Sequence, residues 1–335
     1  MYKTKTEGVI WQKYLPVVNG AYNYSATGQY LTNVNLCETK NKGIELALNT
    51  RNIETKNFQW TSALTFAYNK EEITKLSGTE NDKVTNGDYT YAVGSAINSF
   101  YQYKLDGIWQ KDEEADAAVF GLKPGSIKIN VPDMVRHTDT DGSVYYTKVN
   151  ADGQEIRYDA SNTYSVSADD YQVLGHNSPD WTMGFQNTFT YKDFDLSIYM
   201  RWGQMIKYSV LTDYDPTGLN NYPTYFNVWS EANPSNDFPA MDASIKDKLG
   251  YYPGFSALSY VDGSFFKIKN ITLGYTMPDR LAKKLGLGKL RVYGTITNPF
   301  VLAKSHLLKD YDPEMNGSLN YPLTKQLVFG LNLSF

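Results

Sequence analysis

The sequence contains 335 residues, carries a formal net charge of −4 and has a mean hydropathy of −0.46. The acidic balance argues against a nucleic-acid partner, because no excess of cations is present to neutralise phosphates. Cys37 is the only cysteine, which excludes an internal disulfide and a cysteine-based metal cluster. No run of about 18 apolar residues predicts a membrane helix, and the first residues lack the apolar core of a signal peptide.

Apolar and polar residues alternate along much of the chain with the period of two that is typical of β-strands. In chain order, we predict strands over 44–49, 58–68, 181–191, 194–202, 271–277, 290–297 and 327–335. Weaker candidates lie in 22–35 and 95–110, so we expect about nine or ten strands in all. The short turn Lys192-Asp193 joins two of these strands into a hairpin. The one helix that we expect covers 279–287, after Pro278.

Two long polar insertions, rich in aromatic residues, separate these strands and cover 111–176 and 206–262. The turn at Lys192-Asp193 is very short by comparison. Short turns on one rim and long loops on the other are typical of an outer-membrane β-barrel. The 28 tyrosines, 6 tryptophans and 15 phenylalanines suit membrane interfaces and binding loops, because these rings are amphipathic.

The apolar faces of the strands require a cover, either lipid or the second sheet of a soluble sandwich. These faces carry no charged residue, and the opposite faces are mostly Thr, Ser, Asn, Gln, Gly and Ala. Residues 181–191 would extend over about 33 Å and, tilted by about 45°, would cross about 23 Å, close to the apolar band of outer-membrane barrels. We therefore favour an antiparallel transmembrane barrel, with a secreted glycan-binding sandwich as the alternative.

Several stretches resemble, in the same order, the carboxyl-terminal part of the SusC/RagA family of TonB-linked outer-membrane transporters from Bacteroidetes. The stretches that carry this resemblance are NKGIELALNTRNI (41–53), VGSAINSFYQYKLDGIWQ (93–110), LGHNSPDWTMGFQNTFTYKDFDLSIYMR (174–201), DGSFFKIKNITLGYTMP (262–278), LRVYGTITNPFVL (290–302), YDPE (311–314) and LVFGLNLSF (327–335). The resemblance implies that residues 1–335 form the later part of a plugged barrel of roughly 22 strands. It also implies that a signal peptide, a TonB-binding segment and a plug domain are missing from this chain.

The resemblance further implies a role in TonB-dependent nutrient import across the outer membrane, with no cofactor. The expected partners are a SusD-like surface lipoprotein, the TonB complex, the bilayer and the barrel-assembly machinery, which would read Leu331, Leu333 and Phe335 at the chain end. Glycans or oligosaccharides are the expected cargo, and peptides are the second possibility. A non-functional transporter fragment stays open as an alternative.

Aromatic side chains in the second insertion offer flat faces on which a sugar ring or a peptide side chain could pack. We predict ligand contact first for Trp229 and then for Tyr225, followed by Tyr222, Tyr251 and Tyr252. In the alternative interpretation, these rings only hold a long loop together. Arg201, opposite the apolar face, could line the lumen, pair with Asp195 or contact a plug.

The sequence does not predict a metal site or an enzyme. A calcium loop would require an acidic residue where His137 and Lys148 stand, so we expect acidic loop turns in 137–148, with a looser cation site as the alternative. The three histidines, His137, His176 and His306, are far apart in sequence. The carboxylate pairs Glu113-Glu114 and Asp169-Asp170 are expected to be solvated turns rather than the acid pair of a glycoside hydrolase, which is the third function that we considered.

Overall fold

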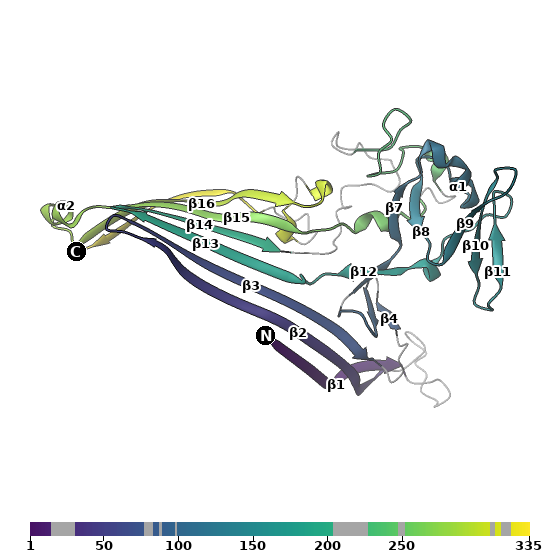
Figure 1. Cartoon of the computed structure of the whole chain (residues 1–335), viewed down its shortest axis with the longest axis horizontal. Coiled ribbons are helices and arrows are strands. Elements are labelled where there is room, and N and C mark those ends of the chain that lie inside the picture. The colour runs from purple at the N-terminus through teal and green to yellow at the C-terminus, as the bar shows by residue number, and fades with distance from the viewer. Residues whose placement is uncertain are drawn as a thin grey trace.

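The computed structural model describes residues 1–14, 31–76, 83–86, 89–97, 99–203, 227–246, 252–308, 312–315 and 323–335. Its main feature is an antiparallel sheet of eight strands, which forms a single curved layer (Figure 1). The strands follow one another across the sheet in chain order: β1 (Tyr2–Tyr14), β2 (Leu31–Glu54), β3 (Phe58–Lys75), β13 (Trp181–Tyr191), β14 (Phe194–Gly203), β15 (Phe265–Thr276), β16 (Lys289–Ala303) and β17 (Gln326–Ser334).

The hairpin of β13 and β14 has the predicted boundaries. Tyr191 pairs with Phe194, and the two turn residues lie between them. Lys192 adopts a positive φ of 51°, which a two-residue turn between twisted strands requires. Consequently the register of the hairpin is fixed, and the apolar residues of both strands emerge on the same face.

The register of the last four strands separates an apolar face from a polar face. Phe194, Tyr275, Val292 and Leu331 lie opposite one another on the apolar face. One residue away, Asp195 pairs with Gly274, which pairs with Tyr293 on the polar face. The Arg291 guanidinium reaches across Gly274 to the Asp195 carboxylate, with 2.6 Å between nitrogen and oxygen. A Cβ atom at Gly274 would crowd that guanidinium and the Asp195 carboxylate, so a side chain there would displace the ion pair.

Asn187 interrupts the apolar face of β13, and the structure explains how a polar side chain is accommodated there. Asn187 lies directly opposite Ser62 on β3. Its Oδ1 accepts hydrogen bonds from the Ser62 hydroxyl at 2.8 Å and from Trp60 Nε1 at 3.0 Å. Because the polar atoms satisfy one another within the sheet, the interruption does not expose an unpaired acceptor to an apolar surrounding.

The apolar face has no protein cover in the part of the chain that the structure describes. Phe329 is 78% exposed, Leu327 61% and Leu273 56%. A soluble sandwich would bury these side chains beneath a second sheet, and no second sheet lies over this face among the described residues. The sandwich alternative was therefore wrong, and the sheet has the character of a barrel wall. None of the described helices is both long and apolar enough to cross a membrane.

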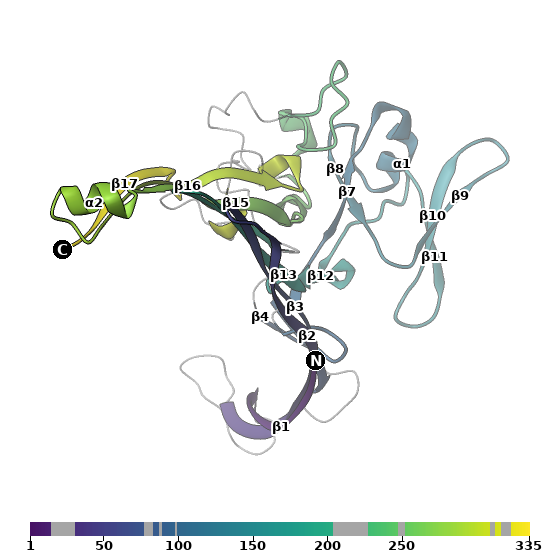
Figure 2. The same ribbon diagram turned by 60° about the vertical axis from the view of Figure 1, so that its left-hand side comes forward.

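Smaller elements gather beyond the long-loop end of the sheet (Figures 1 and 2). They comprise one four-stranded, one three-stranded and one two-stranded sheet. Their strands are β4 (Lys83–Asn86), β5 (Tyr89–Ala92), β6 (Ser99–Gln102), β7 (Lys104–Ile108), β8 (Ile127–Asn130), β9 (Met134–Thr138), β10 (Val144–Val149), β11 (Glu155–Tyr158) and β12 (Gln172–His176). Helix α1 (Glu114–Val119) belongs to this group, whereas α2 (Asp279–Lys284) lies at the short-turn end.

Several expectations need correction. The count of nine or ten strands was too low, because the described residues contain seventeen. Strand β1 and helix α1 were missed, and the candidate 95–110 forms β6 and β7 outside the main sheet. β2 covers 24 residues, far more than 44–49, because its polar first half pairs with the equally polar end of β3. Most of the candidate 22–35 lies outside the described residues.

The two faces of β17 predict opposite effects for one substituent at adjacent positions. Leu331→Asp would lose about 1.5–3 kcal/mol of apolar burial and would bring a carboxylate into hydrocarbon. Asn332 pairs with Arg291 on the polar face, so Asn332→Asp would place its carboxylate beside a cation. We expect Leu331→Asp to block membrane assembly and Asn332→Asp to be tolerated, as measured by the heat-modifiable mobility of the folded barrel. Equal damage from both would contradict the assigned faces.

Candidate functional site

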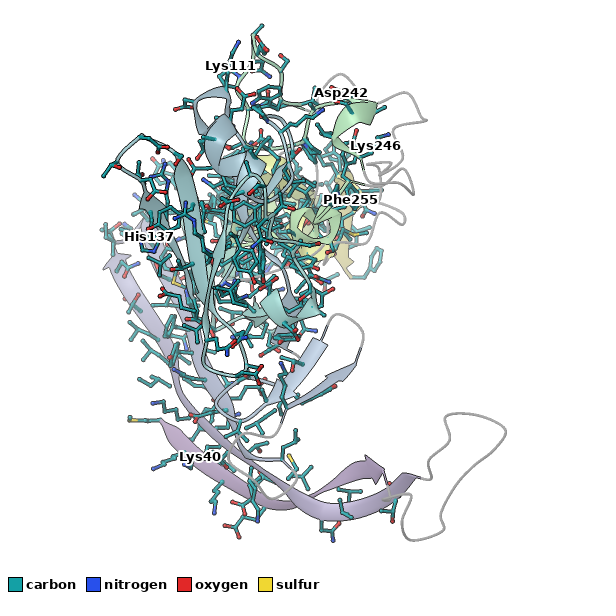
Figure 3. The ribbon with its side chains drawn as sticks, turned by 90° about the vertical axis from the view of Figure 1, so that its right-hand side faces the viewer. Lys40, Lys111, His137, Asp242, Lys246 and Phe255 are labelled. Carbon is teal, nitrogen blue, oxygen red and sulfur yellow. The ribbon has the colours of Figure 1, made fainter. Side chains whose placement is uncertain are left out.

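The described parts of the two insertions pack together into one folded body at the long-loop end, which we call the outer-loop body (residues 99–176, 227–246 and 252–262). Its core takes residues from both insertions and from the strands that flank them. The buried members include Ile108, Ile127, Trp229, Phe238, Tyr252 and Leu258. Figure 3 shows the side chains crowded in this region, with Lys111, Asp242, Lys246 and Phe255 on it and Lys40 far away on β2. The insertions therefore have their own hydrophobic core.

Trp229 lies inside this core rather than on its surface. Its indole is only 9% exposed, and its Nε1 donates a hydrogen bond of 2.9 Å to the Gln110 side chain. The ring packs over Gly125, whose φ is +89° and where a Cβ atom would lie 2.7 Å from the indole. Trp229 thus joins the second insertion to the start of the first. This is the structural role of the alternative interpretation, in which the aromatic rings hold a long loop together.

Tyr252 is buried to a similar extent, at 3% exposure, with the Lys246 ammonium 5.0 Å from the ring centroid. Tyr222, Tyr225 and Tyr251 lie outside the described residues. The structure therefore brings Trp229 and Tyr252 together in one core. Ligand contact by the five aromatic residues stays a prediction, and Trp229 and Tyr252 would need a local opening of the body to reach a ligand.

A three-stranded sheet of β9, β10 and β11 projects from the outer-loop body, and its inner face is fastened by ion pairs. The Arg136 guanidinium pairs with the Asp116 carboxylate, which also accepts a hydrogen bond of 2.6 Å from the Tyr146 hydroxyl. Burial alone would raise the pKa of Asp116, but the hydrogen bonds from Arg136 and Tyr146 outweigh burial and lower it. The carboxylate thus stays charged and holds the sheet against α1.

The same inner face contains a second ion pair, which is more deeply buried than the first. Lys148 pairs with Asp170, whose side chain is fully buried and also accepts a hydrogen bond of 2.7 Å from the Tyr164 hydroxyl. Burial raises the pKa of Tyr164 to about 12, so its hydroxyl stays protonated and donates to that carboxylate. The expectation that Asp169-Asp170 is a solvated turn was wrong for Asp170. Glu113 pairs with Lys128 at 2.7 Å, again in a structural role.

The region 137–148 shows the geometry of a tight turn. Asp141 accepts hydrogen bonds from Ser143, and Asp139 pairs with Arg157 at 2.7 Å. His137 stacks on Tyr145 and contacts the Thr147 hydroxyl at 2.9 Å. Within the described part of the chain, no group of three or more His, Cys, Asp or Glu side chains could hold a metal ion. The acidic residues of this turn therefore stabilise the local backbone.

Histidines and carboxylates do not converge on one point in the described residues. His176 contacts Asp180 at 3.1 Å, and His306 contacts Asp237 at 2.8 Å. These pairs belong to different parts of the chain, and the His137 ring contacts the Thr147 hydroxyl instead of a carboxylate. The arrangement offers polar and aromatic surfaces for binding, and it does not assemble a nucleophile with a general base.

A cluster of charged residues that the sequence did not predict lies on the polar face of the main sheet, and we call it the ion cluster (Arg201, Lys267, Lys269, Asp312 and Glu314). Lys267 has no solvent-exposed surface and pairs with both Asp312 and Glu314, the latter at 2.9 Å. Glu314 also pairs with Lys269 at 2.7 Å and with Arg201 at 2.9 Å. The cluster fastens the connection between β16 and β17 to the sheet.

The ion cluster rules out the pair with Asp195, which is one of the three possibilities considered for Arg201. Its guanidinium contacts Glu314 from the loop, and Asp195 instead pairs with Arg291. The acidic partners lie in the YDPE stretch, more than 40 residues away from the lysines in sequence. No local pattern marks such a pairing, so only the alternation that places Arg201 and Lys267 on the polar face could have hinted at it.

Loss of the buried cation should loosen this loop. Lys267→Met would leave Asp312 and Glu314 short of a partner, and breaking a buried ion pair costs about 3–5 kcal/mol. We expect faster amide hydrogen exchange at residues 312–315 in the folded barrel. Lys111→Met is the matched control, because its pair with Glu231 is 70% exposed on both sides and should contribute less than about 1 kcal/mol. Similar small effects from both variants would contradict the role of Lys267.

The cluster should also respond to acid. Burial would raise the pKa of Glu314, but hydrogen bonds from Lys269 and Lys267 outweigh burial and lower the pKa below its ordinary value of 4.5. A carboxylate with a lowered pKa stabilises the fold at neutral pH, and this contribution is lost as the pH falls below 4.5 and through the lowered pKa. Protection of 312–315, corrected for intrinsic exchange, should fall over that range. In Glu314→Gln, the protection of 312–315 should already be weak at neutral pH and should change less with pH. Equal pH dependence of this protection in the wild-type protein and the variant would contradict the role of Glu314.

Comparison with known proteins identifies relatives over the whole chain, although no protein-family model matches it. TonB-dependent receptor P26 of Formosa agariphila is 30% identical over 90% of this chain and 30% of its own length. TonB-dependent receptor P3 of the same organism and TonB-dependent receptor SusC of Bacteroides thetaiotaomicron are each 25% identical over the whole chain. The chain spans about a third of the length of these relatives, 32% for P3 and 29% for SusC.

Solved structures agree with this relationship. The RagAB peptide transporter matches 99% of this chain and 32% of its own chain, with a TM-score of 0.69 and 25% identity. The open sheet, its uncovered apolar face and the outer-loop body have the architecture of part of an outer-membrane β-barrel. On the ordered sequence motifs, the fold and these relatives together, the chain belongs to the SusC/RagA family of TonB-dependent outer-membrane receptors and matches the carboxyl-terminal part of their β-barrel.

Proposed function

We propose that this chain is the carboxyl-terminal part of a TonB-dependent importer that takes up nutrients across the outer membrane. The observation that carries the proposal is the combination of a lipid-facing wall with a folded outer-loop body, in a chain similar to receptors and transporters over its whole length. In the complete receptor, the wall would close with further strands into a barrel of roughly 22 strands. We expect no enzymatic activity and no cofactor.

The proposed mechanism assigns capture to the long-loop end. A ligand would bind among the outer loops, where a SusD-like lipoprotein would cover it, and TonB would pull on a plug domain to open a path through the lumen. The polar face of the sheet, with Arg201, Lys269 and the Asp195–Arg291 pair, would line that path. The barrel-assembly machinery would read Leu331, Leu333 and Phe335, whose side chains are 56%, 46% and 93% exposed on β17 and at the chain end.

Oligosaccharides are the first cargo that we propose, because the second insertion is rich in tyrosine and asparagine, which suit stacking and hydrogen bonding with sugars. Peptides are the second candidate, and the similarity to the RagAB peptide transporter favours them. Both cargoes would use the same rings, so the sequence of the loops does not separate them.

Uptake in the native host tests this proposal. The complete receptor and its lipoprotein would be expressed in a strain that lacks both, and the uptake of labelled oligosaccharides and oligopeptides would be compared with and without a proton uncoupler. We expect uptake of one class to depend on the receptor and on the proton gradient. Uptake that is independent of both would contradict the proposal.

Loop variants sharpen the same assay. Replacing Tyr222 and Tyr225 with alanine should reduce uptake by about two- to tenfold for each lost stacking contact, with the barrel still folded. Lys40→Gln on β2, far from the outer-loop body, is the control variant (Figure 3). If uptake in the tyrosine variants equals uptake in the control, these rings are not part of the ligand site.

A further inference from the structure

A groove interrupts the apolar face of the sheet near its short-turn end. On this face Leu273 lies opposite Gly294, which lies opposite Phe329. Gly294 contributes no side chain, so the surface is low at this position, and the Phe329 ring borders it, with its nearest carbon 3.3 Å from where a Cβ atom would lie. The groove, which we call the lipid groove, has a volume of about 500 Å³. It is lined by Phe194, Leu273, Tyr275, Val292, Phe329 and Leu331.

The lipid groove is apolar and open to the surroundings of the barrel. Phe329 is 78% exposed, Leu273 56% and Val292 43%, so the groove is not filled by other described parts of the chain. Its volume lies in the range of small-molecule sites. Because the outer surface of the wall faces hydrocarbon, an apolar chain is the occupant that fits the lining.

Cations are carried by the turn and the helix that adjoin the end of the groove nearest the membrane surface. Lys192 is two residues from Phe194, and the turn that holds it is tied to β15 by the hydrogen bond from Thr276 N–H to the Asp193 carbonyl, at 2.8 Å. Helix α2 follows β15 directly and is placed beside the same end in Figures 1 and 2. Its Arg280, Lys283 and Lys284 are all exposed.

These cations are available for an external anion. Within the described residues, none of Lys192, Arg280, Lys283 and Lys284 forms an ion pair. The acidic residues in the same segments are only Asp193 and Asp279, so four cations face two carboxylates. The groove and the cations are close together, because Tyr275 and Pro278 are three residues apart and an extended chain covers about 10 Å over that length.

Helix α2 also has the character of a membrane-surface helix. Leu281 and Leu285, one turn apart on the same side, are 46% and 62% exposed, whereas Ala282 is buried. A short helix with exposed leucines and basic residues suits the boundary between headgroups and acyl chains. The short-turn end is the periplasmic end of an outer-membrane barrel, which places α2 at the periplasmic leaflet.

We propose that the lipid groove holds an acyl chain of an anionic phospholipid from the periplasmic leaflet, with its phosphate on Lys192 and the basic residues of α2. The low apolar surface at Gly294 selects the chain, and the net positive rim selects the charge of the headgroup. This site goes beyond import and rests only on the position of the sheet in the membrane, so it is independent of the cargo.

The test uses the complete receptor, purified in mild detergent and studied by native mass spectrometry. The probes are phosphatidylglycerol, which is anionic, and phosphatidylethanolamine with the same acyl chains, which has no net charge. We expect the wild-type receptor to retain phosphatidylglycerol preferentially. Equal retention of the two lipids would overturn the headgroup assignment and with it the proposal.

Two kinds of variant separate the parts of the site. Gly294→Leu fills the groove and should abolish specific retention of phosphatidylglycerol, whereas Leu46→Phe on the apolar face of β2 should not. Lys192→Gln, Lys283→Gln and Lys284→Gln should each weaken the binding of phosphatidylglycerol by about fivefold. Lys40→Gln is the control, because Lys40 is exposed on β2 far from the short-turn end. Heat-modifiable mobility verifies that every variant is folded.

Several outcomes would contradict the proposal. Undiminished retention of phosphatidylglycerol in folded Gly294→Leu would show that the lipid binds elsewhere. A receptor dimer that disappears in this variant, with lipid retention unchanged, would assign the groove to a second copy of the barrel. Because retention is measured without cargo, failure of this site would leave the import proposal untouched, and failure of uptake would leave this site untouched.

Discussion

The pairing of backbone groups is the constraint on which the rest of the structure depends. Hydrocarbon offers no partner for an N–H or a carbonyl, so a chain that crosses it in strands must satisfy each group through its neighbours. The main sheet does so with an antiparallel ladder from β1 to β17, which is interrupted by register shifts at a few positions and in which the strands of the sheet follow one another in chain order. Once that ladder is fixed, the pleat alone decides which side chains face lipid and which face the lumen.

Polar groups within the wall follow the same constraint. Asn187 on the apolar face is bonded to Ser62 and Trp60 of the neighbouring strand, and Asp195 on the polar face is paired with Arg291 across Gly274. Buried charge gathers where the wall meets its loops, at Lys267 and its two carboxylates. The long loops carry a hydrophobic core of their own, which gives the outer-loop body a defined shape at the entrance to the lumen.

The sequence predicted the wall well and the outer-loop body poorly, for physical reasons. In Trp181–Tyr191 and Phe194–Gly203, apolar and polar residues alternate over a long stretch that is bounded by a short turn. The sequence therefore predicted both the strands and the side chains on each face. The strands around the insertions, such as Ile127–Asn130, are too short to show a period. Trp229 resembled an exposed binding residue because its partners, Gly125 and Gln110, are over 100 residues away. The ion cluster escaped notice for the same reason.

Site-directed spin labelling along β13 tests the central claim that this sheet is a membrane-facing wall. Cys37 is the one cysteine of this chain, so it is replaced, together with any cysteine in the rest of the complete receptor, before single labels are placed at 183, 184, 185, 186, 188 and 189 in bilayers. We expect high accessibility to oxygen, which partitions into lipid, at Met183, Phe185 and Phe189, and lower accessibility at Gly184, Gln186 and Thr188. A uniform response at all six positions, or high access of a water-soluble relaxant on the apolar face, would contradict this claim.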